Sequence, residues 1–141
     1  MASVLKVDEM QGVTSAGDIT ITGEGGTGTQ SLQQGLCKAW VNCDGTDSSA
    51  AVRDSFNISS TTDNAATGQV DLAFTNNFNN NDYSPCGWAA SIGNSTAWVG
   101  GPPSIVDSEM ATGTLNIFTS YQNSLGAEYA YTCANVFGDL A

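Results

Sequence analysis

The sequence offers hydroxyl, thiol and carboxylate groups for chemistry but no imidazole. The chain contains no histidine, so a serine nucleophile would lack its usual base and zinc would lack an imidazole ligand. Residues 93–97 (GNSTA) match the nucleophile-elbow pattern at all but its last position. Carboxylate chemistry remains, but fourteen acidic residues supply some pair at a glycosidase distance by chance alone. We therefore predict that the protein is not an enzyme and has no catalytic residue.

Two acids need separate mention because they fall within predicted strands. Asp54 and Asp71 could point into a cleft from such positions. Solvent exposure, or a salt bridge to Arg53 or Lys38, explains an acid in a strand better than catalysis does. We assign neither of them a catalytic role.

One group of glycines has the spacing of a nucleotide-binding turn. Gly23, Gly25 and Gly28 match G-x-G-x-x-G directly after a predicted strand. Only residues 29–34 separate these glycines from the next predicted strand, which is too short for the crossover helix of a parallel βαβ unit. The stretch also lacks the lysine of a phosphate-binding loop. We predict no cofactor, and expect residues 23–30 to be a flexible connection or a tight crossover.

The acidic loops offer oxygen ligands of the kind that calcium prefers. Asp44, Asp47, Asp63 and Asp82 lie among Asn and Thr residues. None of them is followed by the glycine and glutamate spacing of an EF-hand. We predict no metal site.

The four cysteines are constrained by strand geometry. Cys37 and Cys43 are six residues apart in one predicted strand, so their Cα atoms lie about 20 Å apart, beyond the disulfide limit of about 7 Å. A bond between Cys86 and Cys133 stays open. Thiols in a protein made in a cytosol are more often small buried apolar groups, and we favour that interpretation.

Aromatic side chains could form a platform that stacks on sugar rings. Trp88, Trp98, Tyr83 and Tyr121 are the candidates, although packing in the core explains each of them better. Tyr83 borders the polar loop 76–82 (NNFNNND), which we expect at a tip of the domain. Receptor contact is therefore expected at Asn79, Asn80, Asn81, Asp82 and Tyr83.

The charge and hydropathy of the chain argue against several classes of partner. The net charge of −11 repels nucleic-acid phosphates and anionic lipid. No apolar run approaches the roughly 18 residues of a membrane span, and no charged-then-apolar export signal opens the chain. We predict no nucleic-acid and no membrane partner, and synthesis in a cytosol.

Hydrophobic alternation predicts an all-β fold. Val, Ile, Thr and aromatic residues alternate with polar ones between clusters of Gly, Asn and Asp. Short strands at even spacing indicate an antiparallel β-sandwich or a Greek-key or jelly-roll-like barrel, preceded by short N-terminal docking strands. We expect a segment 1–30 and a β domain 31–141. The predicted strands cover residues 3–7, 18–22, 36–43, 52–59, 69–75, 86–92, 97–99, 114–121 and 128–137, with a turn-rich link at 60–68.

Four blocks of this β domain form a recognisable pattern. They are residues 35–46 (GLCKAWVNCDGT), 52–68 (VRDSFNISSTTDNAATG), 70–75 (VDLAFT) and 79–89 (NNNDYSPCGWA). Together they resemble a domain that recurs in tail-fibre and other structural proteins of marine and cyanobacterial phages. The closing residues 131–139 and the opening residues 3–11 also resemble such proteins. Cys43 stands where an aromatic residue is usual, and Cys86 is a second departure.

The resemblance implies a structural protein of the bacteriophage virion, made in the host cytoplasm and often a homotrimer. It implies that the N-terminal segment docks to tail or capsid proteins while the β domain projects outward. The docking candidates are Val4, Leu5, Val7, Ile19 and Ile21. A short tail-fibre or surface-appendage domain that contacts a host surface glycan is the first expectation. A capsid decoration protein is the alternative, since some thirty residues before the domain leave no room for a long shaft.

Overall fold

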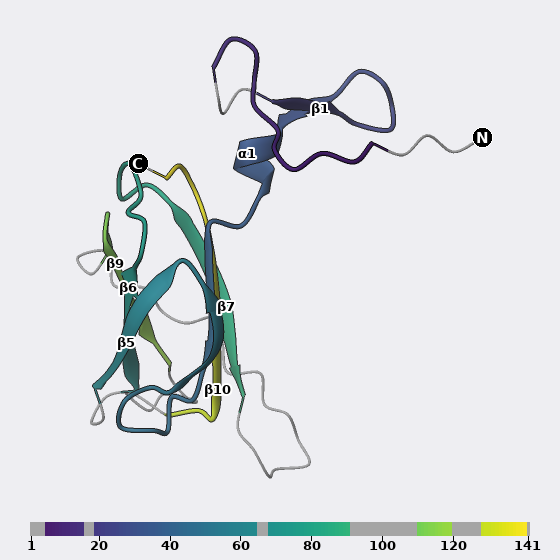
Figure 1. Ribbon diagram of the computed structural model, residues 1–141. Coiled ribbons are helices and arrows are strands. Elements are labelled where there is room, and N and C mark those ends of the chain that lie inside the picture. The colour runs from purple at the N-terminus through teal and green to yellow at the C-terminus, as the bar shows by residue number, and fades with distance from the viewer. Residues whose placement is uncertain (1–4, 16–18, 65–67, 91–109, 120–127, 141) are drawn as a thin grey trace. The chain divides into compact units, whose positions relative to one another are not determined.

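The computed structural model describes residues 5–15, 19–64, 68–90, 110–119 and 128–140 (Figure 1). The chain divides into two compact units, Met1–Leu36 and Cys37–Ala141, which are taken separately below. Compactness thus divides the chain after Leu36. That residues 1–30 dock to a particle and that residues 31–141 fold as a separate β domain stay predictions.

The first unit is built on a short hairpin and one turn of helix. Its elements are β1 (Thr20–Thr22), β2 (Thr29–Ser31) and α1 (Leu32–Gly35). The two strands pair antiparallel, and the Gly23 amide donates to the Gly28 carbonyl at 2.8 Å to close the turn between them. Gly26 has a φ of 73°, a conformation that glycine adopts without a steric cost. The glycine-rich stretch is therefore the turn of a hairpin.

The two predicted N-terminal strands have different outcomes. The second forms as β1 over Thr20–Thr22. The first, residues 3–7, is wrong over its described part, because residues 5–7 take no strand conformation. Alternation alone does not hold a strand that lacks a hydrogen-bonded neighbour.

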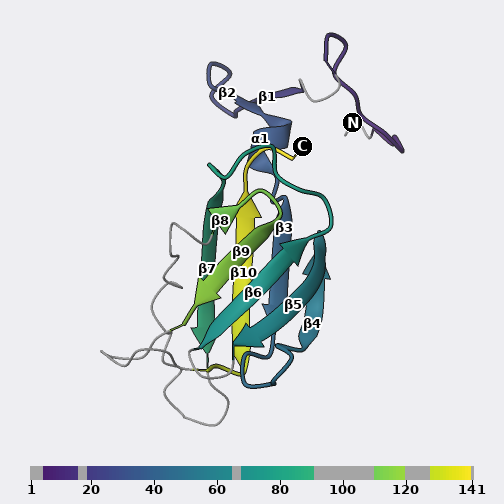
Figure 2. The same ribbon diagram turned by 90° about the vertical axis from the view of Figure 1, so that its left-hand side faces the viewer.

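Within the described residues, the second unit is a sandwich of two antiparallel sheets (Figure 2). The first sheet has the strand order β4-β3-β10-β7 and the second β5-β6-β9-β8. The strands of the first sheet are β3 (Ala39–Cys43), β4 (Val52–Phe56), β7 (Ser84–Ala90) and β10 (Tyr131–Phe137). Those of the second are β5 (Ile58–Asn64), β6 (Gln69–Phe74), β8 (Met110–Ala111) and β9 (Thr114–Phe118). The prediction of an all-β sandwich is confirmed.

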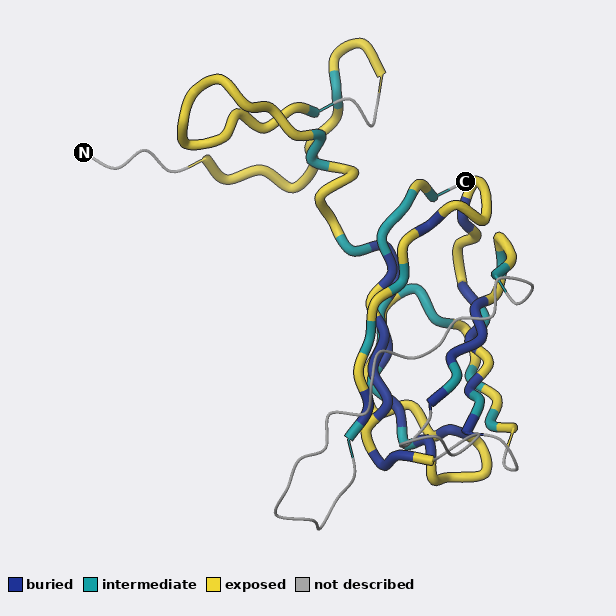
Figure 3. The backbone as a smooth tube through the Cα atoms, turned by 180° about the vertical axis from the view of Figure 1, so that it is seen from behind, coloured by how far each residue is buried: buried dark blue, intermediate teal, exposed yellow. Residues whose placement is uncertain are grey.

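The core lies between the two sheets, where Figure 3 shows the buried stretches of the strands. Every second residue of β3 and of β6 points inward, as the sequence alternation predicts. Each large apolar side chain buried there contributes about 1.5–3 kcal/mol relative to exposure. The core side chains from the strands are Ala39, Val41, Cys43, Val70, Leu72, Phe74, Leu115, Ile117, Ala134 and Val136.

A single residue carries the chain from one sheet to the other. β4 ends at Phe56 and β5 begins at Ile58, so Asn57 alone forms the corner, with a φ of 59°. Its Oδ1 accepts from the Asn76 backbone amide at 2.7 Å, and its Nδ2 donates to the Asn76 carbonyl at 3.0 Å. The predicted continuous strand 52–59 is therefore wrong: it breaks at Asn57 and its end joins the other sheet.

The turn-rich link predicted at residues 60–68 is also wrong in its first half. Residues 60–64 continue β5 and pair with β6. Polar side chains suit this edge strand because its outer face is solvated. The Thr61 hydroxyl has a partner within the protein, since it donates to the Ala50 carbonyl at 2.8 Å. Pairing with a neighbouring strand here outweighs the turn preference of Ser, Asp and Asn.

The later predicted strands are shifted or only partly described. Strand 86–92 begins two residues earlier, as β7, and its residues 91 and 92 lie outside the described part of the chain. Strands 114–121 and 128–137 form as β9 and β10 over shorter spans. The predicted strand 97–99 falls wholly outside the described residues.

Candidate functional site on the outer sheet face

The outward surface of the first sheet carries several aromatic rings. Because alternate residues of β3 are buried, Trp40 faces outward and is half-buried. The strand registers place Phe56, Trp88 and Tyr131 on the same surface, where they are 52%, 45% and 36% exposed. We call the surface that carries Trp40, Phe56, Trp88 and Tyr131 the ring face.

The first row across this face combines two rings and an amide. Trp40 on β3 is paired with Phe56 on β4 and, on its other side, with Asn135 on β10. Asn135 is exposed and is followed across the sheet by Cys86 on β7. Side chains paired in this way lie about 4.5–5.5 Å apart at Cβ, so the Asn135 amide stands beside the Trp40 ring.

The next row across this face has a carboxylate at one end and an aromatic ring at the other. Asn42 on β3 lies between Asp54 and Cys133, and Cys133 in turn pairs with Trp88 on the edge strand. The Asn42 carboxamide oxygen is covered and has no hydrogen-bond partner in the described part of the chain. A carboxylate and an amide therefore share the face with the Trp88 ring.

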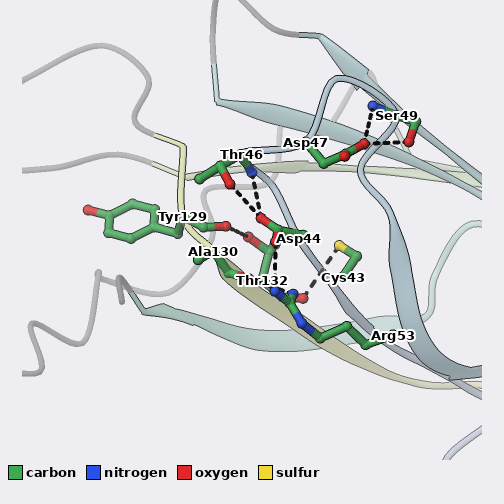
Figure 4. Close-up of polar contacts among 9 residues, drawn as sticks. All are labelled: Cys43, Asp44, Thr46, Asp47, Ser49, Arg53, Tyr129, Ala130 and Thr132. Carbon is green, nitrogen blue, oxygen red and sulfur yellow. Dashed lines mark hydrogen bonds and ion pairs between the residues drawn. The ribbon is translucent and has the colours of Figure 1, made fainter. Parts of the chain in front are cut away.

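Tyr131 is held in place by Arg53 at one end of the ring face. The Arg53 guanidinium carbon lies 4.6 Å from the centroid of the Tyr131 ring. Its Nη1 donates to the Ala130 carbonyl at 2.5 Å, and its Nη2 contacts Asp44 Oδ2 at 2.7 Å (Figure 4). The arginine is thus tied to the backbone and to a carboxylate while it covers one side of the tyrosine.

The carboxylate partner sits in a tight turn that fixes its position. Asp44 Oδ1 accepts from the Thr46 hydroxyl at 2.6 Å and from the Thr46 amide at 3.1 Å (Figure 4). These bonds, the hydroxyl's first, together with the Arg53 charge, lower the pKa of Asp44. Gly45 lies between Asp44 and Thr46 in the turn, and its backbone amide donates to the Tyr129 carbonyl at 2.9 Å. A Cβ at Gly45 would lie 3.0 Å from that oxygen. The turn therefore requires glycine.

Four of the five predicted receptor-contact residues are exposed, and the fifth is buried. Asn79, Asn80, Asn81 and Asp82 are exposed, and the Asp82 amide donates to Asn80 Oδ1 at 2.9 Å, as expected of an asparagine-rich turn. The expectation for Tyr83 is wrong, because it is only 4% exposed.

Tyr83 is buried because its hydroxyl and its ring both have partners inside the sandwich. Its hydroxyl lies 2.8 Å from the Thr114 carbonyl and 3.1 Å from the Ala111 carbonyl. Its ring packs on Phe74 and Phe78. Tyr83 therefore anchors the loop and offers no ring to a ligand.

The predicted docking residues lie in the first unit. Leu5, Val7 and Ile21 are 79%, 52% and 47% exposed, and Ile19 is half-buried. Val4 lies outside the described residues. Ile21 also lines a hollow of about 190 Å³ with Leu32 and Leu36. These residues are not part of the ring face.

No member of the ring face was among the predicted receptor-contact residues. Of the aromatic residues considered for sugar stacking, Trp88 alone belongs to the ring face, and the preference for core packing is wrong for it because it is 45% exposed. Trp98 and Tyr121 lie outside the described residues. Trp40 alternates in the sequence with Ala39 and Val41, so its position places it on the opposite face of the strand from these apolar residues. Phe56 and Tyr131 needed the strand register to be placed beside it.

The cysteines are free thiols. Cys86 pairs with Asn135 and Cys133 with Trp88, so the two cysteines are diagonal neighbours with Cα atoms about 7–8 Å apart, longer than a disulfide allows. Burial raises the pKa of Cys133, and burial raises the pKa of Cys43 to about 12. The exposed cysteine is Cys86.

The acids of the strands and loops can be placed as well. Asp54 and Asp71 are exposed, on the outer faces of the first and second sheet. Among the residues that the structure describes, no three Cys, Asp or Glu side chains group as metal ligands. No helix in that part of the chain is long and apolar enough to cross a membrane.

No model of a protein family, no curated protein and no solved structure matches this chain. What the fold and the ring face define is a β-sandwich with an aromatic and amide-bearing outer surface.

Proposed function

We propose that this protein is a structural component of a bacteriophage virion, a short tail-fibre or surface-appendage domain that contacts the host surface without catalysis. The proposal starts from the resemblance of residues 35–46 and 52–68 to phage structural proteins. Those blocks supply β3, β4 and β5 with the Asn57 corner. The resemblance therefore falls on the framework of the sandwich.

The observation that best supports docking to a particle is the exposure of apolar side chains in the first unit. Leu5, Val13 and Ile21 are 79%, 105% and 47% exposed. A unit of this size has little core of its own in which these side chains could be buried. Burying such side chains against tail or capsid proteins would give the unit the missing apolar contacts. The same contacts would orient three copies if the protein trimerises, as the resemblance implies.

Decoration of the capsid is the alternative role. The exposed apolar side chains of the first unit would serve equally well to clamp neighbouring capsid subunits. The two roles differ in copy number, because an appendage is present in tens of copies at the tail and a decoration protein in hundreds on the shell.

Docking is tested by substitution in the full chain, in phage that encodes the variant. Ile21→Asp places a charge in the apolar surface of the first unit, and we expect incorporation into purified particles to fall at least tenfold, since an unpaired charge in an apolar interface is strongly unfavourable. Val52→Asp is the matched control, because Val52 is similarly exposed, at 43%, in the second unit. Equal incorporation of the two variants would contradict docking through the first unit.

A further inference from the structure

We infer that the ring face binds a neutral glycan. This inference rests on the proposed host-contact function. It makes the ring face, and not the asparagine loop, the main contact with the host. Sugars present axial C–H groups that stack on aromatic faces and hydroxyls that need amide or carboxylate partners. Both kinds of group occur together on this surface. Three of its four rings are 36% to 52% exposed.

The amide groups of the face lie close to its tryptophans. Asn135 is paired with Trp40, and Cys133 alone separates Asn42 from Trp88 across the sheet. A surface built for a dry contact between protein subunits would place apolar groups in these positions. Rings with amides close beside them suit a ligand that carries both C–H and hydroxyl groups, as a sugar does.

The spacing of the rings suits an extended ligand. Trp40 and Trp88 are on strands separated by β10, so their Cα atoms are offset by roughly 10 Å across the sheet and roughly 7 Å along it. Separate sugar units of one chain can therefore meet the two tryptophans. Phe56 extends the same row beyond Trp40.

Tyr131 is prepared for stacking before a ligand arrives. Arg53 covers one side of its ring and is itself fixed by the Ala130 carbonyl and by Asp44. A ring held in this way loses little conformational entropy on binding, and Tyr131 remains 36% exposed.

Charge determines which glycans fit. Asp54 lies in the same row as Asn42, and the chain carries a net charge of −11. The Arg53 cation at the end of the face is paired with the Asp44 carboxylate. The negative charges repel sulfated, phosphorylated or uronic-acid polymers. They leave neutral polysaccharides as the ligand class.

The test uses the full chain, fluorescently labelled, on an array of neutral and anionic oligosaccharides. Electrophoresis of the unlabelled chain in gels that contain dextran, galactomannan, mannan or alginate follows. We expect binding to at least one neutral glycan and none to alginate. Trp88→Ala and Trp40→Ala should each weaken that binding about tenfold or more, as for a ring at the centre of a contact. Phe118→Ala is the matched control, because Phe118 is a half-buried ring on the outer face of the second sheet.

The outcomes decide the inference in either direction. Loss of neutral-glycan binding in the two tryptophan variants, with unchanged thermal unfolding and with Phe118→Ala unaffected, supports it. Binding to no neutral glycan, binding to alginate alone, or binding that survives both tryptophan substitutions overturns it. Self-association that Trp88→Ala abolishes, without glycan binding, would also overturn it, since the face would then join copies of the chain. None of these results bears on incorporation into particles, so the proposed virion role is tested separately.

Discussion

Tyr83 and Cys43 show how burial in a small sandwich controls single ionisable groups. Burial raises the pKa of Tyr83 to about 12 and that of Cys43 to about 12. Both groups are neutral in the folded protein at a pH where they ionise freely in the unfolded chain. Folding is therefore favoured below about pH 9 and loses this contribution as the pH rises towards 12.

This relationship predicts the alkaline stability of the protein. The free energy of unfolding should be constant near pH 8 and should fall between about pH 9 and pH 12, by about 2–4 kcal/mol for each group at most. Urea unfolding at a series of pH values measures it. Tyr83→Phe should lower stability by about 1 kcal/mol at pH 8 through the lost hydroxyl bonds, and should flatten the fall above pH 10. An equally steep fall in the variant would contradict the assignment to Tyr83.

Thiol reactivity gives a second prediction at the residue scale. Cys86 is exposed, whereas Cys43 and Cys133 are buried and have raised pKa values. A chromogenic disulfide reagent at pH 8 should therefore modify Cys86 first in the native protein, ahead of the half-buried Cys37 and the two buried thiols, because the reagent must reach a thiolate. Cys86→Ser should remove the fast phase. The absence of a fast phase from the unsubstituted protein would mean that Cys86 is bonded or covered.

Among the elements, the corner at Asn57 carries the clearest test. Asn57 has a positive φ and joins β4 to β5 while its side chain holds Asn76. Asn57→Ala should destabilise the protein by about 2–3 kcal/mol, since it loses these bonds and strains the backbone. Asn57→Gly keeps the backbone freedom and should cost less. Thermal or urea unfolding ranks the three proteins, and an alanine variant as stable as the glycine variant would contradict the role of the left-handed backbone.

The elements also show what the sequence can and cannot predict. Alternation identifies β3 and β6, because one face of each strand is buried and the other is solvated. It fails at Asn57, where the alternation continues although the chain turns a corner into the other sheet. It also fails at residues 60–64, where strand pairing outweighs local turn preference. It also misplaces Tyr83, since a tyrosine beside a polar loop does not reveal the carbonyl groups that its hydroxyl reaches.

The ring face could be predicted only in part for the same reason. Trp40 and Trp88 lie far apart in the sequence, and no local pattern relates them. They share a surface because β10 pairs with both β3 and β7. Long-range strand order of this kind is not encoded in the alternation of any single segment.

At the scale of the whole molecule, two surfaces of different character lie in two separate units. The first unit exposes apolar side chains such as Leu5 and Ile21, and we propose that it docks to the particle. The second unit carries the ring face, which we propose as the contact with the host. We therefore expect a substitution in one unit to affect its own role and to leave the role of the other unit intact.

The central proposal is a place in the virion, and the most direct test counts copies in purified particles. Quantitative mass spectrometry should use a protease that cleaves at Asp, because Lys6, Lys38 and Arg53 alone offer too few sites for trypsin. Particles purified through a density gradient should contain tens of copies each, when the signal is calibrated against that of the major capsid protein. Hundreds of copies would favour the capsid-decoration alternative. Absence of the protein from intact particles would contradict both virion roles.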